Sequence, residues 1–332
     1  MHEMIGGVFH RVSQSVTVPE HEWLAARPYR IGASEAPIIC GVSRFESAWG
    51  LYQTKVATID GVAEPDEGHE GMYWGHKLEP AIIARFEEVT GCPTWVEPKI
   101  TTHLWRENPA IVATLDAVAE HFQPTPPMET VTEHQKEGHV SLVPLEVKNV
   151  SAYLLDEWQD QTPLYYQVQV QHQMLVTGTQ MAYLAALIGG NTFRWARVER
   201  DDAFIERMLA LELEFLVRVK ERRAPDVDGS KETKGWLAKL YPQDVGTIVQ
   251  LPAAAVDWDM DRERGKAMIA AGEEIVTLSE NQFKAAIADA SAGVLANGVS
   301  YSYKMTTRVD KPRLEAVTHQ FRTLRRSDKR AR

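Results

Sequence analysis

The sequence is poor in cysteine and has no long apolar segment. Its 332 residues include only two cysteines, Cys40 and Cys92, so the chain has neither a disulfide framework nor a zinc site built on cysteine pairs. The longest apolar stretch, residues 181–190, is far shorter than the roughly 20 residues that a membrane span needs. Residues 1–14 also lack the charged start and apolar run of a secretory signal. We therefore expect a cytoplasmic protein with no membrane association.

Several common cofactor motifs are missing as well. The chain has no glycine-rich phosphate loop, no His-Glu-x-x-His and no Cys-x-x-Cys, which excludes the commonest nucleotide-binding proteins and zinc enzymes. The composition, with 44% hydrophobic and 25% charged residues, is that of a globular protein with enough apolar surface for a core. The length favours one large domain with an appendage.

Charge is distributed unevenly along the chain. The formal net charge of −10 argues against non-specific nucleic-acid binding by the whole surface. Residues 301–332, however, carry ten Lys or Arg against three Asp or Glu, a local charge of +7 that leaves −17 for the rest. A basic end on an acidic body can contact phosphates, and it can equally be a solvated tail. The sequence leaves both interpretations open.

Apolar periodicity predicts a mixture of helices and strands. Helices are expected over residues 35–40 (with Ser34 as the N-cap), 47–57, 73–90, 163–177 and 202–222. Strands are expected over residues 94–102, 111–120, 140–149, 181–188 and 192–198. This order predicts an α/β or α+β core over residues 1–225. A helical extension with a basic tail follows over residues 226–332, with a short helix at 234–241, two helices within 253–296 broken near Gly272, and a strand over 299–309.

Acidic residues occur on two of the expected strands. Asp116 follows Ile-Val-Ala-Thr-Leu, and Glu146-Val-Lys148 follows Val-Pro-Leu. Because side chains alternate along a strand, Glu146 and Lys148 project from one face, about 6–7 Å apart. Two carboxylates suit Mg²⁺, and a lysine beside them can hold or activate a metal-bound water. A surface cross-strand ion pair explains the same spacing, so the pattern alone does not decide between the two.

Glu79 has an unusual place in the helix expected over residues 73–90. Helical spacing puts it on one face with Ile82, Ile83 and Phe86. A carboxylate that faces inward is costly unless it is paired or binds a cation. A position at the helix start, where free backbone N–H groups favour acids, explains Glu79 equally well.

The helix expected over residues 163–177 combines apolar residues with glutamines. Tyr166, Val170 and Met174 are spaced by four and share its apolar face. Gln169 and Gln173 fall elsewhere, and we expect both on the helix surface.

Several motifs occur in an order that is more specific than any one of them. In chain order they are Trp23-x-x-x-Arg27 with Ser34, Trp74-Gly-x-x-x-Glu79, Asp116, Glu146-Val-Lys148, and Gln169-Val-Gln171 before Met174. Together they resemble the lambda-type, YqaJ-like phage exonucleases of the PD-(D/E)XK nuclease superfamily, over about residues 20–220. The resemblance implies a restriction-endonuclease-like fold, a mixed central sheet flanked by helices. It also implies a Mg²⁺-dependent (or Mn²⁺-dependent) 5′-to-3′ exonuclease that acts on linear duplex DNA and leaves 3′ single strands for annealing recombination.

The resemblance also implies roles for particular residues. The implied metal ligands are Asp116, Glu146, the backbone carbonyl of Val147 and, in support, Glu79. Lys148 would position the attacking water, and Gln169 would complete the catalytic group from its helix.

A separate group is implied at the DNA end. Arg27 and Ser34 match residues that receive the 5′-phosphate, a role suited to a guanidinium beside a hydroxyl. Arg30 competes for that role, or is an ordinary surface arginine. The implied partners are double-stranded DNA ends, a single-strand annealing protein of the RecT/Redβ type and further copies of the chain, which form a ring if the resemblance extends to assembly. The implied location is a bacterial or phage-infected host cytoplasm.

Two departures and two alternatives accompany this interpretation. The segment from Asp116 to Glu146 is longer than in the compact lambda-type enzyme, and Ala117 stands where a glycine often follows the aspartate. One alternative is a Cas4-like or RecB-like nuclease of other polarity, although two cysteines cannot form a four-cysteine iron–sulfur site. The other is a non-catalytic DNA-binding recombination scaffold.

Overall fold

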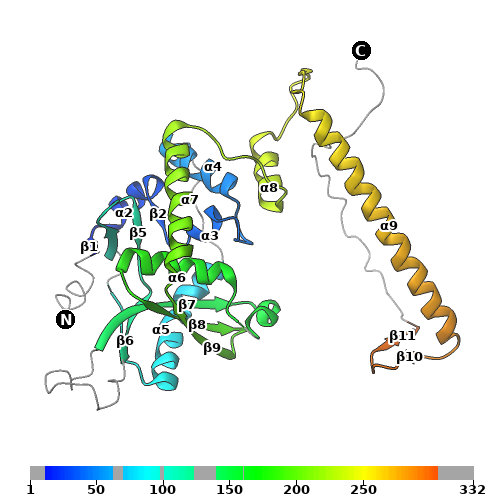
Figure 1. Ribbon diagram of the computed structural model, residues 1–332, viewed down its shortest axis with the longest axis horizontal. Coiled ribbons are helices and arrows are strands. Elements are labelled where there is room, and N and C mark those ends of the chain that lie inside the picture. The colour runs from blue at the N-terminus through cyan, green and yellow to red at the C-terminus, as the bar shows by residue number, and fades with distance from the viewer. Residues whose placement is uncertain (1–11, 63–69, 98–100, 123–139, 160, 306–332) are drawn as a thin grey trace, which may run out of the picture. The chain divides into compact units, whose positions relative to one another are not determined.

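The computed structural model describes residues 12–62, 70–97, 101–122, 140–159 and 161–305 (Figure 1). The chain forms two compact units, Met1–Leu240 and Tyr241–Arg332. The first unit has mixed sheets flanked by helices, which confirms the expected fold class. The functional boundary expected near residue 225 stays a prediction. In the part of the chain that the structure describes, no helix is long and apolar enough to cross a membrane.

A five-stranded mixed sheet forms the centre of the first unit. Its strands, in spatial order, are β3 (Thr94–Trp95), β6 (Ala117–Phe122), β7 (Val140–Val150), β8 (Met181–Ile188) and β9 (Thr192–Glu199). β7 and β8 are parallel, and the other neighbours are antiparallel. Leu145 and Val147 of β7 belong to the apolar cluster under one helix, so the alternating Glu146 and Lys148 face the opposite side.

Helices cover both faces of this sheet (Figure 1). On one face α5 (Glu70–Thr90) packs Ile82, Ile83 and Phe86 against β7 and β8. On the other lie α6 (Leu164–Thr177) and α7 (Asp202–Glu221). The explanation of Glu79 as a helix-start residue is wrong, because α5 begins at Glu70 and continues through Pro80.

Local sequence signals explain where several helices begin and end. The Ser47 side chain accepts a hydrogen bond from the N–H of Gly50 and starts α4 (Ala48–Ile59). Asp201 caps α7 in the same way. Gly178 ends α6 with φ of +72°, a left-handed conformation that glycine adopts without strain.

A second sheet carries the N-terminal part of the chain. Its strands, in spatial order, are β1 (Ser13–Thr17), β4 (Thr101–Trp105), β5 (Ile111–Ala113) and β2 (Ile31–Gly32). Beside it lie α2 (Glu20–Ala26), a 3₁₀ helix (Arg27–Tyr29) and α3 (Ala36–Ile39). The single strand expected over residues 111–120 is wrong, because β5 belongs to this sheet and β6 to the central one. The strand expected over 94–102 is likewise two short strands, β3 and β4, in different sheets, with residues 98–100 outside the described part.

The last element of the first unit is α8 (Lys231–Leu240), which follows α7 in the chain. A 3₁₀ helix at Ala152–Trp158 comes earlier, between β7 and α6. The hydroxyl of Thr233 lies 2.8 Å from that of Ser47, and the indole N–H of Trp236 donates to Glu46 at 3.4 Å. These contacts hold α8 against the start of α4.

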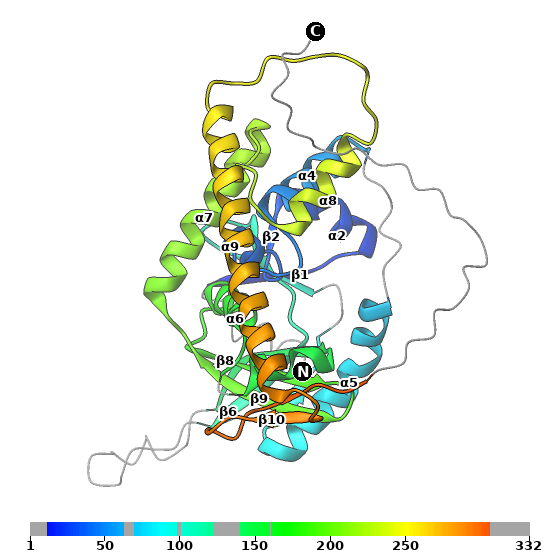
Figure 2. The same cartoon turned by 90° about the vertical axis from the view of Figure 1, so that its right-hand side faces the viewer.

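The second unit is dominated by α9 (Ala255–Ile287), one uninterrupted helix of 33 residues (Figure 2). The break expected near Gly272 is wrong, because a single glycine costs a helix only about 1 kcal/mol and good helix formers flank it. β10 (Ala292–Val294) and β11 (Ser300–Ser302) form a hairpin after α9. Most of the basic segment and the end of the strand expected over 299–309 lie outside the described residues.

Candidate functional site

A cleft of about 340 Å³ collects most of the residues that the sequence singles out. Seven of the eight predicted side chains line it: Arg27, Arg30, Ser34, Asp116, Glu146, Lys148 and Gln169. Glu79 is not among the lining residues, whereas His76 of the same helix is. Glu79 still acts on the cleft, because its charge contributes to raising the pKa of Asp116. The expected N-cap role of Ser34 is wrong, since Glu35 precedes α3 and Ser34 is exposed in the cleft.

Asp116 lies at the join between the two sheets, in the short link from β5 to β6. Its Oδ2 accepts a hydrogen bond from the backbone N–H of Val147 at 2.8 Å. Burial and the nearby Glu146 carboxylate raise the pKa of Asp116 well above its usual value, against the opposing effects of Lys148 and the Val147 N–H. Two carboxylates crowded in this way favour a shared cation.

Glu146 is 2% exposed and is held by three donors. Its Oε1 accepts from the Lys148 ammonium and from the Gln169 amide, the latter at 2.6 Å. Its Oε2 accepts from the Gln173 amide. Charge-assisted bonds of this kind fix the direction of the carboxylate. Glu146 is therefore oriented from both β7 and α6.

The expectation that Gln169 and Gln173 lie on the surface of their helix is wrong. Both are buried and face β7, because α6 packs against both sheets and α7 and keeps almost no solvent-facing side. The sequence analysis gave Gln173 no role. The available signal was the spacing of four between the two glutamines, which puts both amides on one helical face.

Lys148 is a charged group at the edge of the cleft, with its side chain 20% exposed. Burial acts to lower the pKa of Lys148, but Glu146 and Asp116 outweigh it and raise the pKa overall. The ammonium also lies 5.2 Å from the centroid of the Tyr166 ring, a cation–π contact. Lys148 is thus held in place as a cation.

A buried ion pair supports the arginine side of the cleft. The Lys55 ammonium donates to the backbone carbonyls of Arg27 at 3.1 Å and Arg30 at 2.7 Å, and it pairs with Glu35 at 2.8 Å. Glu35 in turn accepts from the N–H of Gly32. Burial lowers the pKa of Lys55, although Glu35 opposes this effect. The sequence analysis missed this pair, whose signal is a lysine among the apolar positions of α4.

A second buried pair lies beneath the cleft. His172 of α6 donates from Nε2 to the carbonyl of Val112 at 2.9 Å, and its Nδ1 lies 2.7 Å from Glu212 of α7. Burial acts to lower the pKa of His172, but Glu212 and the Val112 bond raise it overall. Because Val112 lines the cleft, the pair ties α6 and α7 to the cleft floor.

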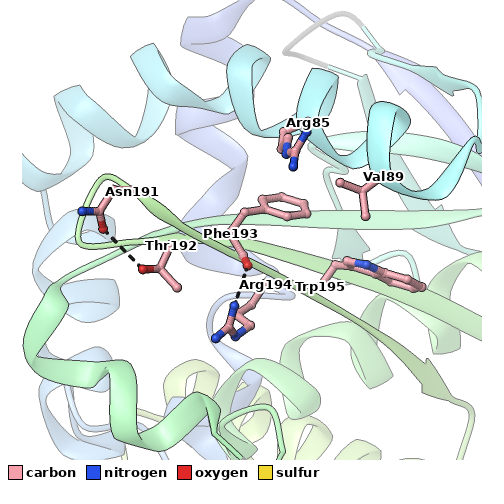
Figure 3. Close-up of a pocket in the computed structure, with 7 residues that line it drawn as sticks. All are labelled: Arg85, Val89, Asn191, Thr192, Phe193, Arg194 and Trp195. Carbon is pink, nitrogen blue, oxygen red and sulfur yellow. Dashed lines mark hydrogen bonds between the residues drawn. The ribbon is translucent and has the colours of Figure 1, made fainter.

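Another pocket, of about 600 Å³, lies between α5 and β9 and is shown in Figure 3. Its described lining is Arg85, Val89 and residues 191–195, and it includes no carboxylate and none of the predicted site residues. The acid–lysine chemistry therefore belongs to the cleft on the α6 side.

The donor set of the cleft fits a hard divalent cation. Asp116 and Glu146 supply carboxylate oxygens, and among the described residues no group donates to Oδ1 of Asp116. The N–H and C=O of one strand residue point to the same side, so the Val147 carbonyl is on the Asp116 side of β7. In the described part of the chain, no group of three or more His, Cys, Asp or Glu side chains is arranged to hold a metal ion.

Comparison of the sequence with known proteins gives the family of the chain. Residues 22–180 match the YqaJ-like viral recombinase domain. The protein YqaJ of Bacillus subtilis (strain 168) is 31% identical over 306 residues, which cover 89% of this chain and 86% of that protein. The chain belongs to the YqaJ family, and the resemblance to YqaJ-like proteins is confirmed.

Two solved structures are also similar. An alkaline exonuclease (LHK-Exo) from Laribacter hongkongensis has 20% identity and a TM-score of 0.45, covering 66% of this chain and 99% of that one. A phage related exonuclease from Haemophilus somnus 129PT has 14% identity and a TM-score of 0.38, covering 58% of this chain and 96% of that one.

Proposed function

We propose that the chain is a metal-dependent exonuclease that digests linear duplex DNA from the 5′ end and leaves 3′ single strands for recombination by strand annealing. One observation carries the proposal: two carboxylates and a lysine share a cleft with two arginines. Carboxylates and a lysine suit phosphodiester hydrolysis, and arginines suit a phosphate. Membership of the YqaJ family agrees with a role in recombination.

Asp116, Glu146 and the backbone carbonyl of Val147 hold Mg²⁺, or Mn²⁺, in this proposal. Glu79 adds negative charge from α5 without lining the cleft. The bound cation supplies positive charge that stabilises the attacking and leaving oxygens of the phosphodiester. Gln169 and Gln173 keep Glu146 in one orientation through their amide groups.

Lys148 orients the attacking water. Its ammonium has three donors, of which Glu146 takes one, so the others are available to a water or a phosphate oxygen in the cleft. The raised pKa keeps Lys148 protonated, so it acts as a donor and a positive charge.

Arg27, Arg30 and Ser34 receive the 5′-phosphate. Lys55 donates hydrogen bonds to the backbone carbonyls of both arginines, so the backbone that carries their guanidinium groups is held in place. A terminal phosphate bound there directs the following phosphodiester toward Asp116 and gives the reaction its 5′-to-3′ polarity. A RecT/Redβ-type annealing protein, assembly into a homo-oligomeric ring and a cytoplasmic location complete the proposal.

Digestion of end-labelled DNA tests the proposal. Linear duplexes labelled at either the 5′ or the 3′ end are incubated with Mg²⁺, Mn²⁺ or EDTA. We expect early metal-dependent release of the 5′ label by the wild type, loss of release in Glu146→Ala, and normal release in Glu88→Ala, whose carboxylate is on the exposed surface of α5. Early release of the 3′ label would contradict the polarity. No release with either metal would favour the DNA-binding scaffold.

A further inference from the structure

The long helix α9 exposes large apolar residues along one face. Five of them are between 58% and 70% exposed: Met268, Ile269, Ile275, Val276 and Leu278. The opposite side of the helix carries polar residues: Lys266, Glu273, Glu274, Glu280 and Asn281. In proteins, most helical stability comes from burying such an apolar face against a partner. A patch of this kind indicates an interaction surface.

Large and small residues alternate along this face with a repeat of seven. Ile269 and Val276 are seven apart, and each is followed three positions later by a small residue, Gly272 and Ser279. Gly265 continues the small series one repeat earlier. A seven-residue repeat is the pattern by which one helix packs along another with a slight left-handed twist. The face therefore fits a second long helix.

We propose that this second helix is α9 of another copy of the chain, running antiparallel. In that orientation Ile269 lies opposite Ser279 of the second copy, and Val276 lies opposite Gly272. Each large side chain then fills the space above a small one, which is the arrangement that packs closely. A parallel pair would instead place Gly272 against Gly272 and Ser279 against Ser279, leaving voids that destabilise the contact.

Charge supports the same register. When Val276 of one copy lies opposite Gly272 of the other, Lys266 of the first copy lies beside Glu280 of the second. The same contact forms a second time with the two copies exchanged. An antiparallel pair of identical helices has a two-fold axis at its centre, and there Glu273 lies near Glu273 of the second copy. Both carboxylates are on the solvent side, where salt screens their repulsion. Opposite charges thus flank the apolar contact on both sides of the centre. The inference does not depend on the proposed nuclease activity.

Cysteine cross-linking tests the register. Ile269→Cys and Ser279→Cys are made separately in a chain whose Cys40 and Cys92 are replaced by alanine. The two variants, carrying different tags, are produced either alone or together and then mildly oxidised. We expect a disulfide between the two different chains and little between identical ones, because the antiparallel register brings position 269 within disulfide reach of position 279. Disulfides between identical chains only, or none at all, would overturn the proposal.

The assembly mass gives a second, independent test. Val276→Glu places a charge in the proposed contact, while Asn281→Glu places one on the polar side of the same helix. Val276 is exposed within the described part of the second unit, so both variants should keep the helical signal in circular dichroism. By light scattering we expect Val276→Glu to halve the mass of the assembly and Asn281→Glu to leave it unchanged. A wild-type monomer, or a mass insensitive to Val276→Glu, would show that something other than a second copy covers this face.

Discussion

Replacing Gln173 by methionine should separate activity from stability. The Gln173 side chain is fully buried, its amide N–H donates to Glu146, and its Oε1 has no hydrogen-bond partner among the described residues. Methionine has a similar length and flexibility but neither polar atom. The substitution therefore removes one donor from Glu146 and, at the same time, one unpaired buried oxygen.

The two effects on the free energy of unfolding nearly cancel. Losing a hydrogen bond to a charged group costs about 1.5–3 kcal/mol, and removing an unsatisfied buried acceptor recovers about 1–3 kcal/mol. Activity has no such compensation, because Gln169 and Lys148 are then the donors that remain to Glu146 among the described residues. Loss of a contact that orients a metal ligand typically costs about 10–100-fold in metal affinity or activity.

The assay is the initial rate of duplex digestion over a Mg²⁺ series, beside urea unfolding of the same variant. We expect the half-saturating Mg²⁺ concentration to rise, or kcat to fall, by about 10–100-fold, with the unfolding free energy within about 1 kcal/mol of wild type. Gln167→Met is the matched control, since Gln167 of the same helix donates to the Thr162 carbonyl instead. A Gln173→Met enzyme with the wild-type rate and metal requirement would refute this account of Glu146.

Three further predictions concern the arginine loop and the buried groups around it. Arg27→Ala should bring the rate ratio between 5′-phosphorylated and 5′-hydroxyl duplexes close to one, and an unchanged wild-type preference would contradict the phosphate role. Lys55→Met should lower the unfolding free energy in urea by about 3–5 kcal/mol, because the Glu35 carboxylate then remains buried without a counter-charge. Recovery in the Lys55→Met, Glu35→Gln double variant is the check. Burial, reinforced by Glu212, raises the pKa of the Cys40 thiol from 9.0 to about 11, so the folded chain keeps a proton that the unfolded chain releases above pH 9. The unfolding free energy should therefore fall between pH 9 and 11, more steeply in wild type than in Cys40→Ala, and parallel curves would show that Cys40 does not contribute.

The residues that meet in the cleft could largely be anticipated from sequence, because strand alternation is a strict rule. It places Glu146 and Lys148 on one face of β7 whatever surrounds them. The order of motifs pointed to Arg27 and Ser34, with Arg30 as a rival, and all three line the cleft although they lie in a different sheet region from β7. How these groups act in catalysis stays a prediction.

The parts that sequence could not provide depend on tertiary surroundings. Reasoning from periodicity assumes that one side of a helix faces solvent. It therefore put Gln173 on the surface, whereas α6 is buried on almost every side. It also read residues 111–120 as one strand, because the apolar pattern does not change where the chain leaves one sheet for the other. The position of Lys55 among apolar residues of α4 indicated burial, but nothing local indicated that Glu35 and two backbone carbonyls would be its partners.

The division of the cleft between two sheets has a consequence for how the chain matures. The acidic half lies within residues 116–173, whereas the arginine half joins it through pairing of Ile31 with Ile111. Contacts between distant parts of a chain generally form late in folding. In a partly folded chain, the carboxylates of the central sheet can thus come together before the arginine side of the cleft joins them. The complete cleft therefore depends on the joining of the two sheets.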